Sequence, residues 1–565
     1  MPSLPQFLPS FSNKTCPAWL LTLIVSAYLL LAFNSSLFST VYVLHGDGGM
    51  KGLIYLASLF VLLLSAFTLL LNTVTVPIAT KPLLIFLVIS SSFAAYFMQS
   101  YNILIDTTMI QNSVETDIHE SLELFNIKLV LYVLALGVLP SWLIIKCRIV
   151  YGTPLQFVLT KLVSSVVCIV LMSVVALLFY QDYASLFRNN RYIRDLIVPV
   201  NYLHAGHKYA VQQLPHKQPN FKHIGEDAQR NSLSSNSAKK PVVTVVIVGE
   251  TARSANFSLF GYNRLTTPLL AQQNILAFNN VSACGTSTAV SLPCMFSRQN
   301  RTQYKRIESI NSDNVLDIAQ RAGLHVIWLD NNSGCKGVCT RIESQTLPPS
   351  TDTSLCNNGE CYDMLLVKQL AHVIENNSDD MLLVLHQKGS HGPAYFLRTP
   401  EAFHQFKPLC HTNQLQECTR EEITNAYDNT ILYTDYVVNT IIELLKSQAY
   451  RLDTSMVYIS DHGESLGENN LYLHGLPYVI APSEQTHVPL IMWLSQGYSQ
   501  RFGIDTDCLS QHQSNAYSHD NVFDSLLGLL NIITHAYKPS QDILNGCKQS
   551  NTQPLHHLQT ASNNR

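Results

Sequence analysis

Residues 241–249 read Pro-Val-Val-Thr-Val-Val-Ile-Val-Gly, an unbroken run of β-branched residues that ends at a glycine. Such a run is typical of a strand buried on both faces, as in a parallel sheet. Similar apolar runs recur along the chain, and helical patterns lie between them. The alternation predicts a layered α/β domain. The further runs are 325–329, 381–385, 455–460 and 488–493, and the helical patterns are 315–322, 363–375 and 426–448.

Acidic and histidine side chains follow three of these predicted strands. In open α/β sheets, ligands bind beyond the carboxyl ends of the strands, so parallel neighbours would bring these side chains to one edge. Carboxylates and imidazoles together suit zinc or a similar divalent ion. Any one of them alone is more often a capping or surface residue, but the set as a whole predicts a metal site. The residues are Glu250, His391, Asp461, His462 and His474.

A nucleophile is expected in the hydroxyl-rich segment Cys284-Gly-Thr-Ser-Thr-Ala-Val-Ser-Leu-Pro-Cys294. Thr288 stands just before a predicted short helix, whose free N–H groups would favour an incoming phosphate. A threonine hydroxyl is a weak nucleophile at its own pKa, and metal coordination can activate it. A helix N-cap is the alternative role for Thr288. The predicted metal ligands favour the nucleophile.

Five apolar stretches have the length that crosses a bilayer. Lysines before the first stretch and in the even-to-odd turns favour a cytoplasmic N-terminus, which places the C-terminal part outside the cytoplasm. The cluster Arg188, Arg191 and Arg194 after the fifth stretch points the other way. The stretches are 18–38, 53–73, 83–99, 128–145 and 155–180.

These patterns divide the chain into four parts. Residues 1–182 form a transmembrane domain, and 183–240 form an interfacial helix on the membrane followed by a linker. A surface helix packed on the soluble domain is the alternative for the first half of that segment. Residues 241–547 form the catalytic domain, and 548–565 are a polar tail expected to be disordered. The formal net charge of −3 gives no basic face for nucleic acid.

Ten of the thirteen cysteines lie in the predicted exported domain, and an even number there suggests disulfides. Their close spacing predicts five pairs, although sequence alone does not fix connectivity. A cysteine–zinc site is the alternative, which the lack of a repeated C-x-x-C disfavours. The predicted pairs are Cys284–Cys294, Cys335–Cys339, Cys356–Cys361, Cys410–Cys418 and Cys508–Cys547.

With these motifs in their order, the chain resembles the lipid A phosphoethanolamine transferases of the alkaline-phosphatase superfamily, which include the mobile colistin-resistance enzymes. No single short motif is specific, but the ordered combination is. The resemblance implies an alkaline-phosphatase/sulfatase-like α/β domain in the periplasm and a domain of five transmembrane helices in the bacterial inner membrane. The motifs are 248–253 (Val-Gly-Glu-Thr-Ala-Arg), 284–297 (Cys-Gly-Thr-Ser-Thr-Ala-Val-Ser-Leu-Pro-Cys-Met-Phe-Ser), 330–333 (Asp-Asn-Asn-Ser), 389–395 (Gly-Ser-His-Gly-Pro-Ala-Tyr) and 460–468 (Ser-Asp-His-Gly-Glu-Ser-Leu-Gly-Glu).

The resemblance also implies roles for individual residues. One zinc would be firmly bound, with Thr288 both ligand and nucleophile, and the site leaves room for a second zinc at the histidines. Lys336, His391 and His474 would be catalytic. The flanking pair Cys335/Cys339 departs from some relatives and leaves the pose of Lys336 open. The implied zinc ligands are Glu250, Thr288, Asp461 and His462. The implied phosphoethanolamine contacts are Asn112, Thr116, Glu120, Asn332, Lys336, His391 and His474.

The implied reaction moves phosphoethanolamine from phosphatidylethanolamine to a phosphate of lipid A through a phosphoethanolamine–threonine intermediate. Lower susceptibility to cationic peptides such as polymyxins would follow. We expect a monomer. A metal-dependent lipid phosphodiesterase or phosphatase that uses water, and a non-catalytic membrane sensor that keeps the fold, are the alternatives. Which lipid A phosphate is modified, and which histidine is the base, stays open.

Overall fold

The computed structural model describes residues 15–45, 49–115, 123–213, 220–231, 240–357 and 360–548. The chain forms two compact units. One contains Met1–Gln111 and Phe125–Leu214, and the other contains Asn112–Leu124 and Pro215–Arg565. The described residues 112–115 and 123–124 therefore belong with the large C-terminal unit, although they lie between apolar helices in the sequence.

The C-terminal unit is built on an eight-stranded sheet. The strands that pair with β4 are parallel to it, as the buried apolar run predicted. The order across the sheet is β15 (Tyr517–Ser518), β5 (Leu276–Ser282), β14 (His487–Leu494), β11 (Asp453–Ser460), β4 (Val242–Gly249), β10 (Met381–His386), β6 (His325–Asp330) and β7 (Glu343–Thr346).

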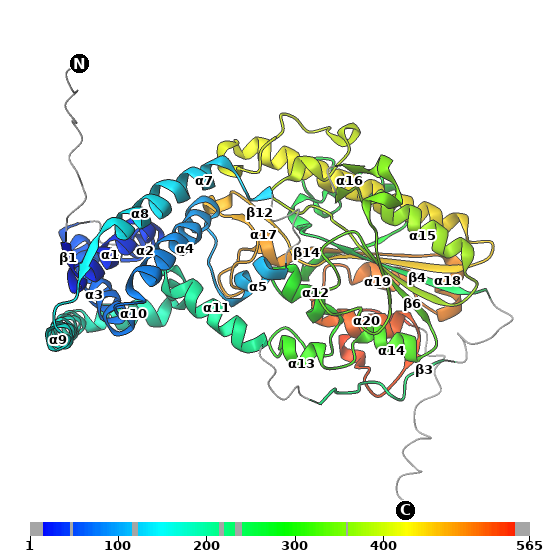
Figure 1. The fold of residues 1–565 in the computed structure, drawn as a ribbon. Helices are drawn as coiled ribbons and strands as arrows, with labels where there is room; N and C mark the ends of the chain where they lie inside the picture. The colour runs from blue at the N-terminus through cyan, green and yellow to red at the C-terminus, as the bar shows by residue number, and fades with distance from the viewer. Residues whose placement is uncertain are drawn as a thin grey trace, which may run out of the picture. The chain divides into compact units, whose positions relative to one another are not determined.

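Helices cover both faces of this sheet (Figure 1). Alternate residues of β4 enter opposite cores because successive side chains of a strand point to opposite faces. Val246 packs with α12 (Thr288–Phe296), α14 (Val315–Arg321) and α20 (Val522–Leu529). Its neighbours Val245 and Ile247 pack with α15 (Met364–Asn376) and α16 (Arg420–Ser447). The fold is thus a three-layer sandwich that buries the central strands completely.

Two features of the sheet differ from the pattern read in the sequence. The run 488–493 forms β14, which is antiparallel to both β11 and β5. Strand β5 was not predicted, because Asn279 and Asn280 are exposed and interrupt its apolar pattern. A β-branched run indicates that both faces of a strand are buried, but it does not indicate the direction of the strand. The antiparallel direction of β14 therefore could not be predicted from the sequence.

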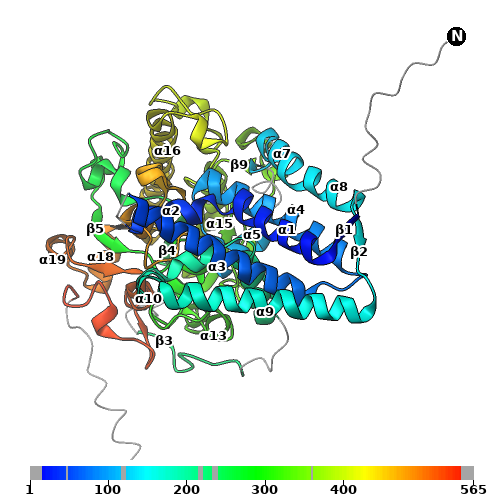
Figure 2. The same cartoon turned by 90° about the vertical axis from the view of Figure 1, so that its left-hand side faces the viewer.

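The N-terminal unit contains four helices long and apolar enough to cross a membrane among the described residues, and five if a bent pair counts as one span. Figure 2 shows α3 and α9 packed side by side. The four helices are α3 (Met50–Val74), α4 (Thr80–Tyr101), the segment Ile127–Lys146 and α9 (Pro154–Leu178).

The first predicted span, 18–38, is not one straight helix. It breaks at Asn34 into α1 (Ala18–Phe33) and α2 (Ser35–His45), which are bent by 65°. Buried Asn34 donates to the Leu29 and Val198 carbonyls over 3.0 and 2.9 Å and accepts from the Val198 N–H over 2.9 Å. These bonds satisfy backbone groups that a break would leave unpaired in an apolar setting.

The fourth span contains a π-helical turn at Leu134–Val138, between α7 (Ile127–Val133) and α8 (Leu139–Lys146). Pro140 lacks the N–H that would bond the Leu136 carbonyl one turn earlier. The Tyr28 hydroxyl donates to that carbonyl over 2.7 Å instead. The span therefore keeps its backbone satisfied across the irregular turn.

The predicted single interfacial helix after the fifth span is in fact three pieces, α10 (Tyr180–Asn189), a 3-10 turn (Arg191–Leu196) and α11 (Val200–Gln213). Pro199 stands between the last two, where a helix is readily interrupted. Tyr202 reaches Ser90 over 2.7 Å, and Asn201 contacts Met98 Sδ over 3.3 Å. These contacts with α4 make α11 part of the apolar unit.

Disulfides join the five cysteine pairs that the spacing predicts. They bridge short loops, with sequence separations of 4 to 39 residues. The pairs are Cys284–Cys294, Cys335–Cys339, Cys356–Cys361, Cys410–Cys418 and Cys508–Cys547. The tail after residue 548 lies outside the described residues.

Candidate active site

Polar side chains gather where β4 and β11 end. Glu250 follows β4 directly, and Asp461 and His462 follow β11, which pairs with β4 in register up to Ser460 and Gly249. All three side chains are fully buried. The convergence expected from the strand-end rule therefore occurs.

Thr288 is the first residue of α12 and is also buried. Its hydroxyl donates to the two carboxylate oxygens of Glu250 over 3.0 and 3.1 Å, and lies 3.4 Å from His462 Nε2. Ser287, in the cap position, makes no capping hydrogen bond with its side chain. Thr288 therefore turns its hydroxyl toward the acidic cluster rather than capping the helix.

The orientation of His462 follows from its backbone contact. Nδ1 lies 3.0 Å from the Gly463 carbonyl, which can only accept, so Nδ1 carries the hydrogen. Nε2 then faces Glu250 Oε1 and Asp461 Oδ2, each 3.3 Å away. Asp461 Oδ1 accepts the N–H groups of Thr251 and His462, over 3.1 and 2.7 Å. This leaves Oδ2 facing the cluster.

The donor set fits a divalent metal ion. The candidate ligand atoms of Glu250, Asp461 and His462 all lie within 4.8 Å of one another. Asp461 Oδ2 is buried and has no hydrogen-bond partner in the described parts of the chain. A buried carboxylate oxygen without a hydrogen bond is costly, and a bound cation relieves that cost.

The pKa values of Asp461, His462 and Glu250 are shifted because these groups are buried close together. Burial and the Glu250 carboxylate raise the pKa of Asp461 to about 6. Burial alone would lower the pKa of His462, but Asp461 and Glu250 raise it to about 9. Burial also acts to raise the pKa of Glu250, yet hydrogen bonds from His386 and His462 hold it well below its ordinary value. A divalent cation bound here would contact the carboxylates of Glu250 and Asp461, both of which are buried away from water.

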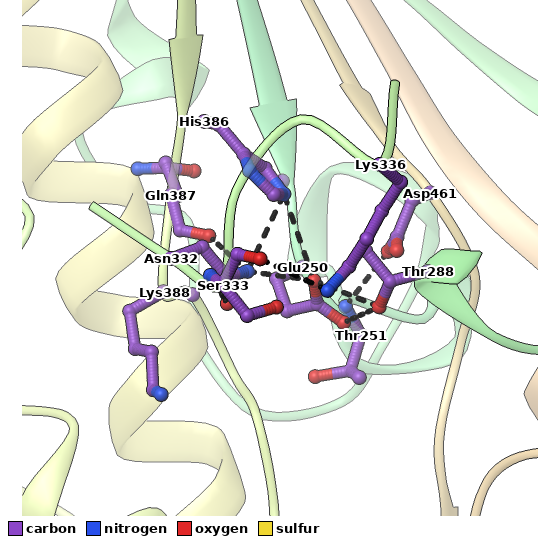
Figure 3. A network of polar contacts seen from close by, with 12 residues as sticks. Glu250, Thr251, Thr288, Asn332, Ser333, Lys336, His386, Gln387, Lys388 and Asp461 are labelled. Carbon is purple, nitrogen blue, oxygen red and sulfur yellow. Dashed lines mark hydrogen bonds and ion pairs between the residues drawn. The ribbon is translucent and has the colours of Figure 1, made fainter. Parts of the chain in front are cut away.

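Sequence reasoning missed a second layer behind Glu250. Asn332, predicted as a substrate contact, donates to Glu250 Oε2 over 2.7 Å (Figure 3). His386, the last residue of β10, lies 3.8 Å from the same oxygen and 3.0 Å from Asp330. Asp330 and the Glu250 carboxylate outweigh burial and raise the pKa of His386 to about 9. His386 and Asp330 are the last residues of β10 and β6. Their position at strand ends was the one sequence signal that could have identified them.

One glycine is required beside Glu250. Gly389 has a φ of +56°, and a Cβ there would lie 2.7 Å from the Glu250 carbonyl oxygen. The next residue, Ser390, donates its N–H to that carbonyl over 3.0 Å. The loop after β10 can therefore approach the end of β4 only with glycine at this position.

A cavity opens above Thr288. The predicted contacts Asn112, Lys336, His391 and His474 line it, together with Glu115, which was not predicted. His391 Nδ1 lies 2.7 Å from the Gly392 carbonyl. His474 Nδ1 lies 3.0 Å from Glu464, a buried residue of the 460–468 motif that had been given no role. The two imidazole centroids are 5.4 Å apart.

Lys336 lies inside the Cys335–Cys339 disulfide loop, with a φ of +50°. Its ammonium donates to the Ser333 and Glu115 carbonyls over 2.9 and 3.1 Å. The side chain of Lys336, whose position the sequence left open, thus lines the cavity. Thr116 and Glu120, two predicted donor contacts, lie outside the described residues.

Comparison with known proteins agrees with this geometry. A sulfatase family profile matches residues 243–532, and a profile described as "Phosphoethanolamine transferase EptA/EptB" matches residues 63–214. The sulfatase match concerns the fold, because the nucleophile segment has no Cys-x-Pro-x-Arg sequence. The fold and the site thus define a membrane-anchored enzyme with a sulfatase-type catalytic unit.

Individual relatives sharpen this class. The chain is 41% identical to phosphoethanolamine transferase EptA of Escherichia coli K12 over 94% of its length and 97% of the relative's. It is 36% identical to "Phosphatidylethanolamine transferase Mcr-1" of E. coli, over 81% and 85%. The integral membrane lipooligosaccharide phosphoethanolamine transferase A from Neisseria meningitidis superposes with a TM-score of 0.91, at 39% identity, covering 95% and 100%. The chain belongs to the phosphoethanolamine transferase family.

Proposed function

We propose that this enzyme transfers phosphoethanolamine from phosphatidylethanolamine to a phosphate of lipid A, through a covalent intermediate on Thr288. The observation that carries the proposal is the Thr288 hydroxyl bonded to Glu250 at the floor of a cavity lined by Lys336 and two histidines. The neisserial relative is a lipooligosaccharide phosphoethanolamine transferase, and Mcr-1 is named as a phosphatidylethanolamine transferase. Both names support the lipid substrates.

Zinc is the metal that we propose for the site. Glu250, Thr288, Asp461 and His462 would hold it, because hydroxyl, carboxylate and imidazole donors suit zinc. When bound, zinc lowers the pKa of the threonine hydroxyl and offsets charge on the phosphate. One ion is expected here, and His391 and His474 leave room for a second.

In the first step, the Thr288 hydroxyl releases its proton to water, Oγ attacks phosphorus, and the bond from phosphorus to the diacylglycerol oxygen breaks. Glu250, which accepts the hydroxyl hydrogen bond, aligns Oγ for this attack. Lys336 places a positive charge beside the equatorial phosphate oxygens. One histidine of the pair His391 and His474 gives a proton to the leaving oxygen, because imidazole titrates near neutral pH.

In the second step, a phosphate oxygen of lipid A attacks the same phosphorus, and the bond to Thr288 breaks. Thr288 Oγ takes up a proton from water, the proton lost by the lipid A phosphate returns to the histidine, and the phosphoethanolamine group remains on lipid A. Its amine offsets negative charge there, so cationic peptides such as polymyxins bind less. Phosphatidylethanolamine and lipid A are thus the two partners of the reaction.

The proposed organisation follows the lipid substrates. Residues 1–182, with α11 packed against them, hold the enzyme in the inner membrane. The rest of 183–240 connects the parts, and 241–547 carry catalysis in the periplasm as a monomer. The five disulfides of the C-terminal unit support its location in the periplasm, because disulfides persist in oxidising compartments. Anchoring keeps the site beside both lipids and raises their local concentration.

Mass spectrometry of lipid A from E. coli expressing the chain tests the proposal. A mass gain of one phosphoethanolamine, lost with Thr288→Ala, is expected. Release of free phosphoethanolamine without a gain on lipid A would instead identify the hydrolase. Polymyxin resistance that survives Thr288→Ala would identify the non-catalytic sensor.

A further inference from the structure

Glu115 lies in the last turn of α5 (Thr107–Glu115) and lines the cavity together with Thr288 and Lys336. One of its carboxylate oxygens, Oε1, accepts from Arg306 over 2.9 Å. The other, Oε2, is buried and has no hydrogen-bond partner in the described parts of the chain. One oxygen of a residue that lines the substrate cavity thus makes no hydrogen bond with the described parts of the protein.

Contacts with Arg306 and with Lys336 also hold Glu115 in place. Arg306 donates from its second nitrogen to the carbonyl of Ala289, the residue after the nucleophile, over 3.1 Å. The Glu115 carbonyl, which ends the helix, accepts from the Lys336 ammonium over 3.1 Å. The carboxylate is therefore held in a fixed relation to Thr288 and to the lysine that faces the phosphate.

The chemistry of the transferred group calls for such a residue. The phosphate end is an anion and suits Lys336 and the imidazoles. The other end is a primary ammonium, which needs acceptors and a negative charge. Among the described residues that line the cavity, Glu115 supplies a carboxylate outside the metal cluster. A carboxylate accepts through both oxygens, so pairing with Arg306 leaves capacity for a second cation.

We propose that Glu115 determines specificity for the ethanolamine group, with Oε2 accepting the substrate ammonium and Arg306 acting as its positioning residue. This inference rests on the proposed function. It differs from the role that the family resemblance gives to Glu120, which lies outside the described residues. A purely structural Glu115–Arg306 ion pair is the alternative.

The test compares two lipid donors with the full-length protein in detergent micelles. Phosphatidylethanolamine carries the ammonium, and phosphatidylpropanol replaces it with a methyl group of similar size. The rate of covalent labelling of Thr288 is followed by intact-protein mass spectrometry without acceptor. Wild type should prefer phosphatidylethanolamine. In Glu115→Gln this preference should fall about tenfold, with labelling by phosphatidylpropanol unchanged, because only the ammonium loses a charged partner.

A structural role predicts a different result, since a displaced Thr288 or Lys336 would slow both donors alike and keep their ratio. Arg306→Gln should reduce the ratio, and Arg306→Lys should restore part of it. Glu308→Gln is the matched control, because Glu308 is exposed on the neighbouring helix and pairs with Lys305. Its ratio should equal that of wild type.

An unchanged ratio in Glu115→Gln would overturn the inference, and so would a ratio that collapses only in Glu120→Gln. In both cases wild type still labels Thr288, so the proposed function survives. Absence of labelling in wild type with either donor would overturn the proposed function and this inference together.

Discussion

The Thr288 hydroxyl donates to both carboxylate oxygens of Glu250, over 3.0 and 3.1 Å. The shared hydrogen bond fixes the hydroxyl on the axis of the carboxylate, at the first residue of a helix. The candidate ligands Asp461 and His462 surround the same point. The Thr288 hydroxyl, the proposed nucleophile, is thus held by a residue that is also a candidate metal ligand.

Thr288→Ala should abolish the covalent intermediate, with a loss of at least about a thousandfold in transfer rate. Intact-protein mass spectrometry after exposure to phosphatidylethanolamine measures this loss. Ser287→Ala is the matched control, since its hydroxyl oxygen is buried without a hydrogen bond among the described residues. It should change the rate by less than about threefold. Labelling of the Thr288→Ala protein at another residue would contradict the assignment.

Asp461→Asn should weaken zinc binding at least about tenfold, because the buried Oδ2 loses its negative charge. Zinc content by plasma mass spectrometry after dialysis at low zinc measures this. Treatment of wild type with a chelator should also lower its Tm, since a ligand that binds only the folded state stabilises it. The Tm of Asp461→Asn should respond much less. Equal zinc content in the two proteins would refute the proposed ligand set.

The Cys284–Cys294 disulfide closes the loop that carries Thr288. Removing both cysteines should cost about 3 kcal/mol of stability, from the entropy of a loop of this size. Removing the Cys508–Cys547 pair, with a separation of 39 residues, should cost about 4 kcal/mol. Only the first pair closes the loop that carries Thr288, so removing Cys284–Cys294 should lower the transfer rate more, although it costs less stability. Thermal melts and transfer rates of the two double variants check this. If the variant that loses more stability also loses more activity, the Cys284–Cys294 disulfide does not position Thr288.

Asn34→Ala should destabilise the apolar unit, because the N–H and carbonyl of Val198 would be left unpaired in a buried setting. The expected cost is about 2–4 kcal/mol. Thermal unfolding in detergent measures it. Ser39→Ala is the control, because that serine is exposed on α2 and, among the described residues, bonds only within its helix. Equal Tm values for the two variants would show that water replaces Asn34 at the break.

The amino-acid sequence by itself determined the two-part organisation, the central parallel strands, the strand-end ligands and the close cysteine pairs. These features are local, since apolar period, loop spacing and the residue after a strand can all be read in one segment. The strand-end rule then joined Glu250 to Asp461 and His462, because parallel neighbours end at the same edge.

Only the tertiary structure decided the direction of β14, the break at Asn34 and the residues that surround the ligands. His386 and Glu115 each owe their place to partners far away in the sequence, at Asp330 and Arg306. No local pattern marks such pairs, because a buried charge is stable only where the fold brings its counter-charge within hydrogen-bonding distance. The candidate metal ligands could therefore be predicted from the sequence, whereas the network that orients them became visible only in the folded chain.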